Sequence, residues 1–128
     1  MPEEKRICII EDDQDIRSVL QQILELEGYA VRTAGNGQEA LALLNHEAWP
    51  ADLILLDLMM PVMNGWEFLR KAESLLQSRS IPVIVMSAGS LEQWSFPSEV
   101  VSKLKKPIDV DRLLETLNKV HIRKRPAA

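Results

Sequence analysis

The stretch of sequence that decides the fold is residues 53–65, Leu-Ile-Leu-Leu-Asp-Leu-Met-Met-Pro-Val-Met-Asn-Gly. It opens with an apolar run of strand length, which ends at Asp57. Proline, asparagine and glycine then predict a loop, and apolar residues at three- and four-residue spacing predict a helix that continues through Leu76. A strand without polar alternation, followed at once by a helix, is typical of one β-α unit in a buried parallel sheet.

Comparable units lie before and after this stretch. With the central unit they make five, and the strands of all five lack polar alternation. This pattern predicts an α/β fold: a doubly wound, five-stranded parallel sheet with helices on both faces. The expected strands are residues 7–10, 29–33, 53–56, 82–86 and, with a poorer pattern, 100–105, and helical spacing marks residues 16–24, 40–44, 68–76 and 110–120.

Composition limits the class of protein. The chain has 128 residues, 46% of them hydrophobic, which fits one domain with a substantial core. Its apolar runs are too short to span a membrane, and one cysteine with two histidines excludes an internal disulfide and a zinc cage. We expect a soluble, cytoplasmic protein, with one domain over residues 1–122 and a basic tail over 123–128. Because Arg123, Lys124 and Arg125 are fewer charges than a nucleic-acid patch carries, we expect a solvated tail and no direct nucleic-acid contact.

Polar residues stand at the ends of four predicted strands. Taken singly, each has a structural explanation: Asp13, for example, is a good N-cap for the helix that follows it. In a doubly wound sheet, however, ligands bind beyond the carboxyl ends of the strands, so we expect these residues to converge there. They are Glu11-Asp12-Asp13 after the first strand, Asp57 at the third, Ser87 at the fourth and Lys105-Lys106-Pro107 at the fifth.

Together these residue types indicate phosphoryl chemistry. Carboxylates that converge on one crevice repel each other, so a cation must offset them, and ligands that are all oxygen favour Mg²⁺. A lysine and a serine hydroxyl at the same point supply a charge and a hydrogen-bond donor for a phosphoryl group. Asp57 is the best-placed nucleophile, and its attack on phosphorus yields an acyl phosphate.

The chain resembles a response-regulator receiver domain over about residues 5–121. Four segments carry the resemblance, in order: residues 9–13, residues 57–65 with the spacing D-x-x-M-P-x-M-x-G, residues 85–88, and Lys106-Pro107. The resemblance implies a flavodoxin-like sheet with the strand order 2-1-3-4-5.

The resemblance also implies a role for each residue of the acidic cluster. Asp57 would be the phosphoacceptor. Glu11 and Asp12 match the acidic pair of the family, with Asp12 as a direct Mg²⁺ ligand and Glu11 acting through water. Asp57 and the main-chain carbonyl of Met59 would complete the protein ligands of the metal, and Asp13 stays outside the pair as a helix cap.

Ser87 matches the switch hydroxyl of the family, and Lys106 matches the lysine that pairs with phosphoryl oxygens, followed by a cis Lys106–Pro107 bond. The resemblance therefore implies a phosphorylation-dependent switch of a two-component or phosphorelay system. A sensor histidine kinase or histidine phosphotransfer protein would supply the phosphoryl group, and an unknown downstream protein would receive the signal. Such a domain is not an enzyme beyond assisting its own phosphotransfer and autodephosphorylation. A homodimer is an open alternative.

The chain departs from the family pattern between Ser87 and Lys106. Lys103 stands where receivers place a switch aromatic, and it is also the charge that would protect an edge strand. The segment is short, and Trp94, Phe96 and Pro97 interrupt any helical pattern, so we expect a short, displaced or irregular fourth helix. Two interpretations of the aromatic residues stay open: packing on the sheet, or anchoring a partner.

Three other functions compete. The departures favour a receiver-fold interaction module whose output does not depend on phosphorylation. Residues 35–40 match the glycine pattern of a dinucleotide site, but they follow the second strand and serve equally as a tight turn. A phosphatase with an aspartyl nucleophile would place a second aspartate two residues after Asp57, where this chain has Met59.

Overall fold

The computed structural model describes residues 4–45, 49–92 and 94–120, and within them a five-stranded, all-parallel sheet with the order β2-β1-β3-β4-β5. This confirms the predicted fold class and strand order. The strands are β1 (Arg6–Ile10), β2 (Ala30–Ala34), β3 (Leu53–Asp57), β4 (Val83–Ser87) and β5 (Val100–Lys105), and the helices are α1 (Gln14–Leu26), α2 (Gly37–Leu44), α3 (Gly65–Arg79) and α4 (Val110–Lys119).

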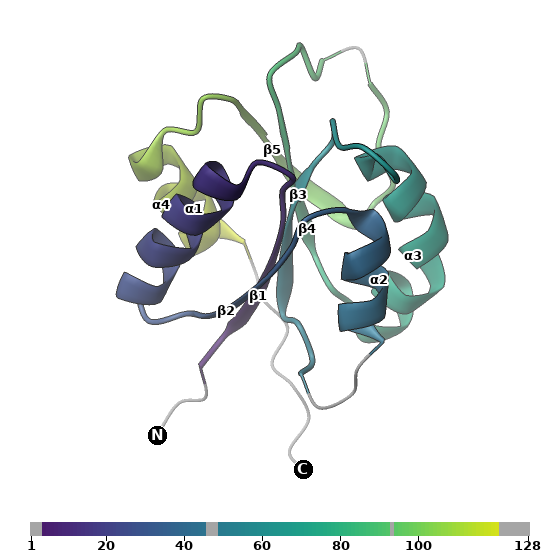
Figure 1. Cartoon of the computed structure of the whole chain (residues 1–128), viewed down its shortest axis with the longest axis horizontal. Helices are drawn as coiled ribbons and strands as arrows, with labels where there is room; N and C mark the ends of the chain where they lie inside the picture. Colours follow the sequence, from purple (N-terminus) through teal and green to yellow (C-terminus); the bar gives the residue numbers. More distant parts are fainter. Residues whose placement is uncertain (1–3, 46–48, 93, 121–128) are drawn as a thin grey trace.

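The helices cover both faces of the sheet, α1 with α4 on one side and α2 with α3 on the other (Figure 1). The side chains of β1 alternate between the two cores: Ile7 and Ile9 pack with α1 and α4, while Cys8 and Ile10 pack with α2 and α3. All four are fully buried, as are the first four residues of β3. This burial on both faces is why β1 and β3 carry no polar alternation, whereas the two edge strands, β2 and β5, are only partly buried.

Side-chain caps determine where the helices begin. The Asp13 carboxylate accepts hydrogen bonds from the main-chain N–H groups of Asp15 and Ile16, which confirms its predicted role at the start of α1. Asn64 and Glu67 form a reciprocal capping box at the start of α3. The polar groups left over at two helix ends are therefore satisfied by residues close by in the sequence.

Gly65 lets α3 begin directly above the end of β3. A Cβ atom at this position would lie 2.7 Å from the Cα atom of Leu58 and 3.0 Å from the main-chain oxygen of Asp57. The Gly65 N–H also donates to the Leu58 carbonyl oxygen at 3.0 Å. Only glycine fits this close approach, which holds the loop after Asp57 against its own strand.

The segment between β4 and β5 is irregular, as the sequence predicts. Neither residues 88–92 nor residues 94–99 contain helix. Phe96 is partly buried against the core on the α2 and α3 side. Trp94 is 45% exposed and packs against Trp66, with ring centroids 5.1 Å apart and ring planes tilted by 56°. Phe96 therefore packs on the core, and Trp94 packs on another aromatic residue.

Lys103 lies exposed on β5, which forms one edge of the sheet, and its Nζ atom is 5.3 Å from the centroid of the Phe96 ring. This location agrees with the interpretation of Lys103 as an edge-strand charge. No helix in the described part of the chain is long and apolar enough to cross a bilayer. The expected basic tail over residues 123–128 lies outside the described residues, so the domain boundaries stay predictions.

Candidate functional site

The register of the sheet brings the predicted polar residues together at the carboxyl ends of the strands. Ile10 lies opposite Leu56 in neighbouring strands, so Glu11 follows β1 beside Asp57 at the end of β3. Asp57 lies opposite Met86, and Ser87 lies opposite Lys105 on β5. The carboxyl ends of four strands therefore meet in one row, as the parallel arrangement predicts.

Lys106 connects two of the carboxylates. Its Nζ atom lies 2.6 Å from Glu11 Oε1 and 3.2 Å from Asp57 Oδ2. The main-chain N–H of Lys106 donates to the Ser87 carbonyl oxygen at 2.8 Å, which continues the pairing of β4 and β5 by one residue. The Lys106–Pro107 peptide bond is cis, as expected from the family resemblance. The lysine therefore projects from the sheet edge onto both buried acids.

Three carboxylates form a cluster that suits a hard cation. Glu11, Asp12 and Asp57 each offer an oxygen, and these oxygens lie within 4.8 Å of one another. Glu11 and Asp57 are buried and Asp12 is exposed, so the cluster opens to solvent on the Asp12 side. Oxygen ligands with one open side fit Mg²⁺, which keeps part of its water shell and takes one or two carboxylates from the protein.

The crowding of these charges appears in the pKa values. Burial, together with the contact with Asp57, raises the pKa of Glu11 from 4.5 to about 7, although Lys106 acts in the opposite direction. For Lys106, burial acts to lower the pKa, but its contacts with Glu11 and Asp57 outweigh that effect and raise it. A charged lysine therefore faces more negative charge than it can neutralise alone, and a divalent cation would complete the balance.

The Asp57 carboxylate has a different partner at each oxygen. Its Oδ1 atom accepts a hydrogen bond from the Met59 main-chain N–H at 3.1 Å, while Oδ2 faces Lys106. The residue is only 2% exposed. The two contacts therefore fix the orientation of the Asp57 carboxylate.

Ser87 ends β4 on the strand beside Asp57 and is 5% exposed. Its Oγ atom accepts a hydrogen bond from the Gly89 main-chain N–H at 3.2 Å. Because a hydroxyl can accept and donate at once, its proton remains able to donate to an anion at the strand ends.

Comparison with known proteins agrees with this geometry. The model of the response regulator receiver domain family matches residues 7–118. The chain belongs to this family.

Similar proteins include both sequence relatives and solved structures. The receiver domain is 39% identical over 87 residues to the transcriptional regulatory protein CpxR of Klebsiella pneumoniae, covering 68% of this chain and 35% of CpxR. The chain therefore spans about a third of that relative. The chemotaxis protein CheY4 of Vibrio cholerae has a similar structure, with a TM-score of 0.81, 28% identity and coverage of 93% of this chain and 100% of CheY4. The response regulator TrrA of Thermotoga maritima, solved in complex with Mg²⁺-BeF, gives a TM-score of 0.76 at 30% identity, covering 90% and 97% of the two chains.

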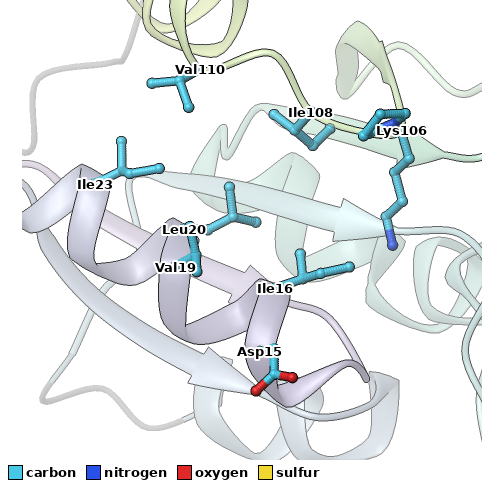
Figure 2. Close-up of a pocket in the computed structure, with 9 residues that line it drawn as sticks. Asp15, Ile16, Val19, Leu20, Ile23, Lys106, Ile108 and Val110 are labelled. Carbon is cyan, nitrogen blue, oxygen red and sulfur yellow. The ribbon is translucent and has the colours of Figure 1, made fainter.

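An apolar groove of about 300 Å³ lies beside the site of the receiver domain (Figure 2). One wall is the exposed side of α1, with Ile16 and Val19, and the other is the segment that leads into α4, with Ile108 and Val110. Lys106, which contacts Asp57, lies at one end of the groove. The groove therefore runs from the surface of α1 toward the acidic cluster.

The structure brings the side chains of Glu11, Asp12, Asp57 and Lys106 together and places Ser87 at the end of the neighbouring strand. It also adds contacts that the sequence did not reveal. The Met59 residue was predicted to act through its carbonyl, but its N–H group is also in use, on Asp57. Arg17 donates to the main-chain oxygen of Glu11 at 2.8 Å. Contacts through main-chain atoms leave no residue-type signal in a sequence, which is why neither was predicted.

Proposed function

We propose that this receiver domain accepts a phosphoryl group on Asp57, with Mg²⁺ held by the neighbouring carboxylates, as a switch in a two-component or phosphorelay pathway. One observation carries the proposal: a buried aspartate at a strand end touches a lysine and lies in a cluster of three carboxylates whose oxygens are within 4.8 Å. The match to TrrA, which was solved with Mg²⁺-BeF, supports the same assignment.

In the proposed reaction, an oxygen of Asp57 forms a bond to phosphorus while the phosphorus–nitrogen bond of a phosphohistidine donor breaks. The departing imidazole takes a proton from solvent. Lys106 then shifts its contact from the carboxylate to a phosphoryl oxygen, since the ammonium group needs a partner of negative charge. The Ser87 hydroxyl donates to a second phosphoryl oxygen.

Asp12, Asp57, Glu11 and the Met59 carbonyl would hold the metal, with Asp12 bound directly and Glu11 through water. When bound, Mg²⁺ supplies positive charge that offsets the phosphoryl oxygens and the repulsion between carboxylates. Hydrolysis of the acyl phosphate resets the switch, so the domain assists only its own phosphorylation and dephosphorylation. We place the reaction in the cytoplasm, where a free buried thiol such as Cys8 stays reduced.

The test is phosphate incorporation from a small-molecule phosphodonor such as acetyl phosphate, followed by intact mass with and without Mg²⁺. We expect one phosphoryl group per chain, dependent on Mg²⁺, and none in Asp57→Asn, because an amide is nearly the same shape but a far poorer nucleophile. The variant should stay folded, since it removes one of several crowded charges. Full incorporation into Asp57→Asn would refute the site, and no incorporation into the wild type would favour the interaction-module alternative.

We propose that the apolar groove between α1 and the start of α4 receives a helix of the histidine-bearing phosphodonor. The groove is lined almost entirely by apolar side chains and ends at Lys106, so a helix lying in it would bring a side chain to the mouth of the Asp57 crevice. An amphipathic helix in an apolar groove is a common recognition mode. Under this proposal, the phosphodonor, either a sensor histidine kinase or a histidine phosphotransfer protein, would present such a helix to the groove.

A charge placed in the groove tests this docking surface. Val19, 53% exposed, lines the groove, whereas Leu26, 87% exposed on the same helix, does not. We expect Val19→Glu to slow transfer from a histidine phosphodonor protein at least tenfold, and Leu26→Glu to leave it unchanged. Acetyl phosphate should phosphorylate both variants at the wild-type rate. Equal transfer rates in the two variants would reject the groove as the docking surface.

The signal then passes to a downstream protein that the chain does not identify. CpxR is named as a transcriptional regulatory protein, but the chain spans 35% of it, so that output belongs to CpxR. For this chain we propose that the downstream protein binds the surface of the receiver domain, and that the segment between β4 and β5 is the part of this surface that changes on phosphorylation.

A further inference from the structure

We infer that Arg17 is a positioning residue for the metal site, and that Gly35 provides the space in which Arg17 acts. The inference rests on the proposed function. It assigns a role to the first glycine of the Gly-x-Gly pattern, which the phosphoryl chemistry does not use.

Glu11 is held at each of its polar groups. Its main-chain N–H donates to the Ala34 carbonyl oxygen at 3.0 Å, and its main-chain oxygen accepts from Arg17 Nη1 at 2.8 Å. Its side chain pairs with Lys106 through Oε1 and accepts from the Asp13 N–H through Oε2, at 3.3 Å. The partners from Ala34 and Asp13 are main-chain atoms, and Lys106 belongs to the site itself. Arg17 is therefore the one side chain among these four partners that comes from outside the site.

The contact with the Glu11 oxygen acts on Asp12 as well. That oxygen belongs to the peptide unit joining the two residues, and a peptide unit is planar. Fixing its oxygen therefore fixes the plane from which the Asp12 Cα atom departs. Asp12 is exposed, and the orientation of its main chain sets the position and direction from which its side chain leaves toward the cluster. One hydrogen bond thus positions both members of the acidic pair.

An arginine suits this task because its guanidinium is planar, permanently charged and rich in donors. Arg17 lies on α1, and its own N–H bonds to the Asp13 carbonyl oxygen at 2.9 Å, so the helix holds the base of the side chain. The side chain is partly buried.

Gly35 follows β2, the strand beside β1, and leaves room for the guanidinium. A Cβ atom at Gly35 would lie 3.3 Å from Arg17 Nη1 and 3.3 Å from Glu39 Oε2, closer than most real contacts of a Cβ atom. Gly28 alone among the described glycines has a positive φ. Gly35 is therefore present for space and not for backbone conformation, and an alanine there would press on Arg17.

The test compares two arginines that make the same kind of contact. Arg79 Nη1 donates to the Leu44 carbonyl oxygen at 2.7 Å, at the far end of α3, about 20 Å along the helix from Gly65. We measure the dissociation constant of Mg²⁺ by calorimetry and the stability by urea unfolding for Arg17→Gln, Arg17→Lys, Gly35→Ala and Arg79→Gln.

We expect Arg17→Gln to weaken Mg²⁺ binding on the order of tenfold, as loss of a group that orients a metal ligand does. Arg17→Lys should recover part of the affinity, Gly35→Ala should lose a smaller factor, and Arg79→Gln should bind Mg²⁺ as the wild type does. At saturating Mg²⁺, phosphorylation of Arg17→Gln by acetyl phosphate should return to near the wild-type rate, because positioning affects occupancy and not the reacting atoms.

Mg²⁺ affinity in Arg17→Gln within twofold of the wild type, or reduced no more than in Arg79→Gln, would overturn the inference. If Arg17→Gln does not fold, unchanged Mg²⁺ affinity in both Arg17→Lys and Gly35→Ala would overturn it. A wild-type protein that binds no Mg²⁺ would overturn the proposed function, and this inference with it.

Discussion

The two sides of the acceptor site are built differently. On the acidic side, residues 11–13 join β1 to α1, and residues 58–64 join β3 to α3. Each polar group of Glu11 has a hydrogen-bond or ion-pair partner, and Asp13 caps α1. On the other side, residues 88–92 and 94–99 contain no helix. The difference indicates that the Glu11 and Asp57 carboxylates are held in place by the fold itself, whereas the segment after Ser87 is the part able to rearrange.

The irregular side is held in its described part by turn hydrogen bonds and by side-chain packing. The Gly89 N–H donates to Ser87 Oγ, Leu91 and Phe96 pack on the core, and Trp94 packs against Trp66. Segments with little regular structure and exposed side chains open at low free-energy cost. Because Lys103 replaces an aromatic residue on β5, the aromatic groups near this face come from the segment itself and from α3.

Glycine-to-alanine substitutions on the two sides should differ most in their effect on the free energy of unfolding. Gly65→Ala places a methyl group 2.7 Å from the Leu58 Cα atom, and we expect a loss of about 2–3 kcal/mol in the free energy of unfolding. Gly89→Ala meets nothing closer than Ser87 Oγ at 3.9 Å, so its change should stay within about 0.5 kcal/mol. Urea unfolding measures both. Equal losses would mean that the irregular segment is as tightly packed as the acidic side.

Neighbouring aspartates on the acidic side should affect different properties. Asp12→Ala should weaken Mg²⁺ binding by tenfold or more, about 1.4 kcal/mol, with little change in stability. Asp13→Ala should leave Mg²⁺ binding nearly unchanged but lower the free energy of unfolding by about 1 kcal/mol, because α1 loses its cap. Calorimetry and urea unfolding check the pair. Similar losses of Mg²⁺ affinity in both variants would show that the assignment of Asp12, and not Asp13, as the metal ligand is wrong.

The pH dependence of the acidic side follows from Glu11. Its pKa is raised from 4.5 to about 7 by burial and by Asp57, so without metal it binds a proton near neutrality. Mg²⁺ competes with that proton, and its affinity should rise severalfold as pH increases through about 7. Calorimetry across this range measures the effect, which Glu11→Gln should abolish.

The stability of the metal-free protein should show the opposite trend. A carboxyl whose pKa is raised by folding stabilises the protein below its ordinary pKa of 4.5, and this contribution is lost as pH rises through about 7. The difference in unfolding free energy between wild type and Glu11→Gln should therefore shift against the wild type across this interval. A difference that does not change with pH would show that Glu11 titrates normally.

The smallest effect concerns the irregular side. In a Trp66→Phe background, Trp94 emission should change when Asp57 is phosphorylated. A shift of Ser87 Oγ toward the phosphoryl group would also move Gly89, whose N–H donates to that oxygen, and the segment that follows. Hydrogen exchange over residues 88–99 should change with it. Buried Trp49 gives a constant background. Unchanged Trp94 emission and unchanged hydrogen exchange at full phosphorylation would show that the segment after Ser87 does not rearrange more than the acidic side.

The sequence by itself determined the fold class, the residues at the strand ends and the cap at Asp13. These depend on local patterns: apolar runs, helical spacing, and the rule that parallel strands end at a common edge. It also predicted an irregular segment after Ser87 from Trp94 and Pro97. The strand order came from the family resemblance, since the spacing of the elements does not specify which strands are neighbours.

Only the tertiary structure decided which atoms meet. Lys106 could have faced solvent, but the sheet register places it on both Glu11 and Asp57, and burial there raises the pKa of Glu11. Arg17 on the Glu11 carbonyl and Trp94 on Trp66 likewise join segments that are distant in sequence or meet through main-chain atoms. Such contacts depend on distances between packed elements to within an ångström, and a linear pattern of residue types holds no record of those distances.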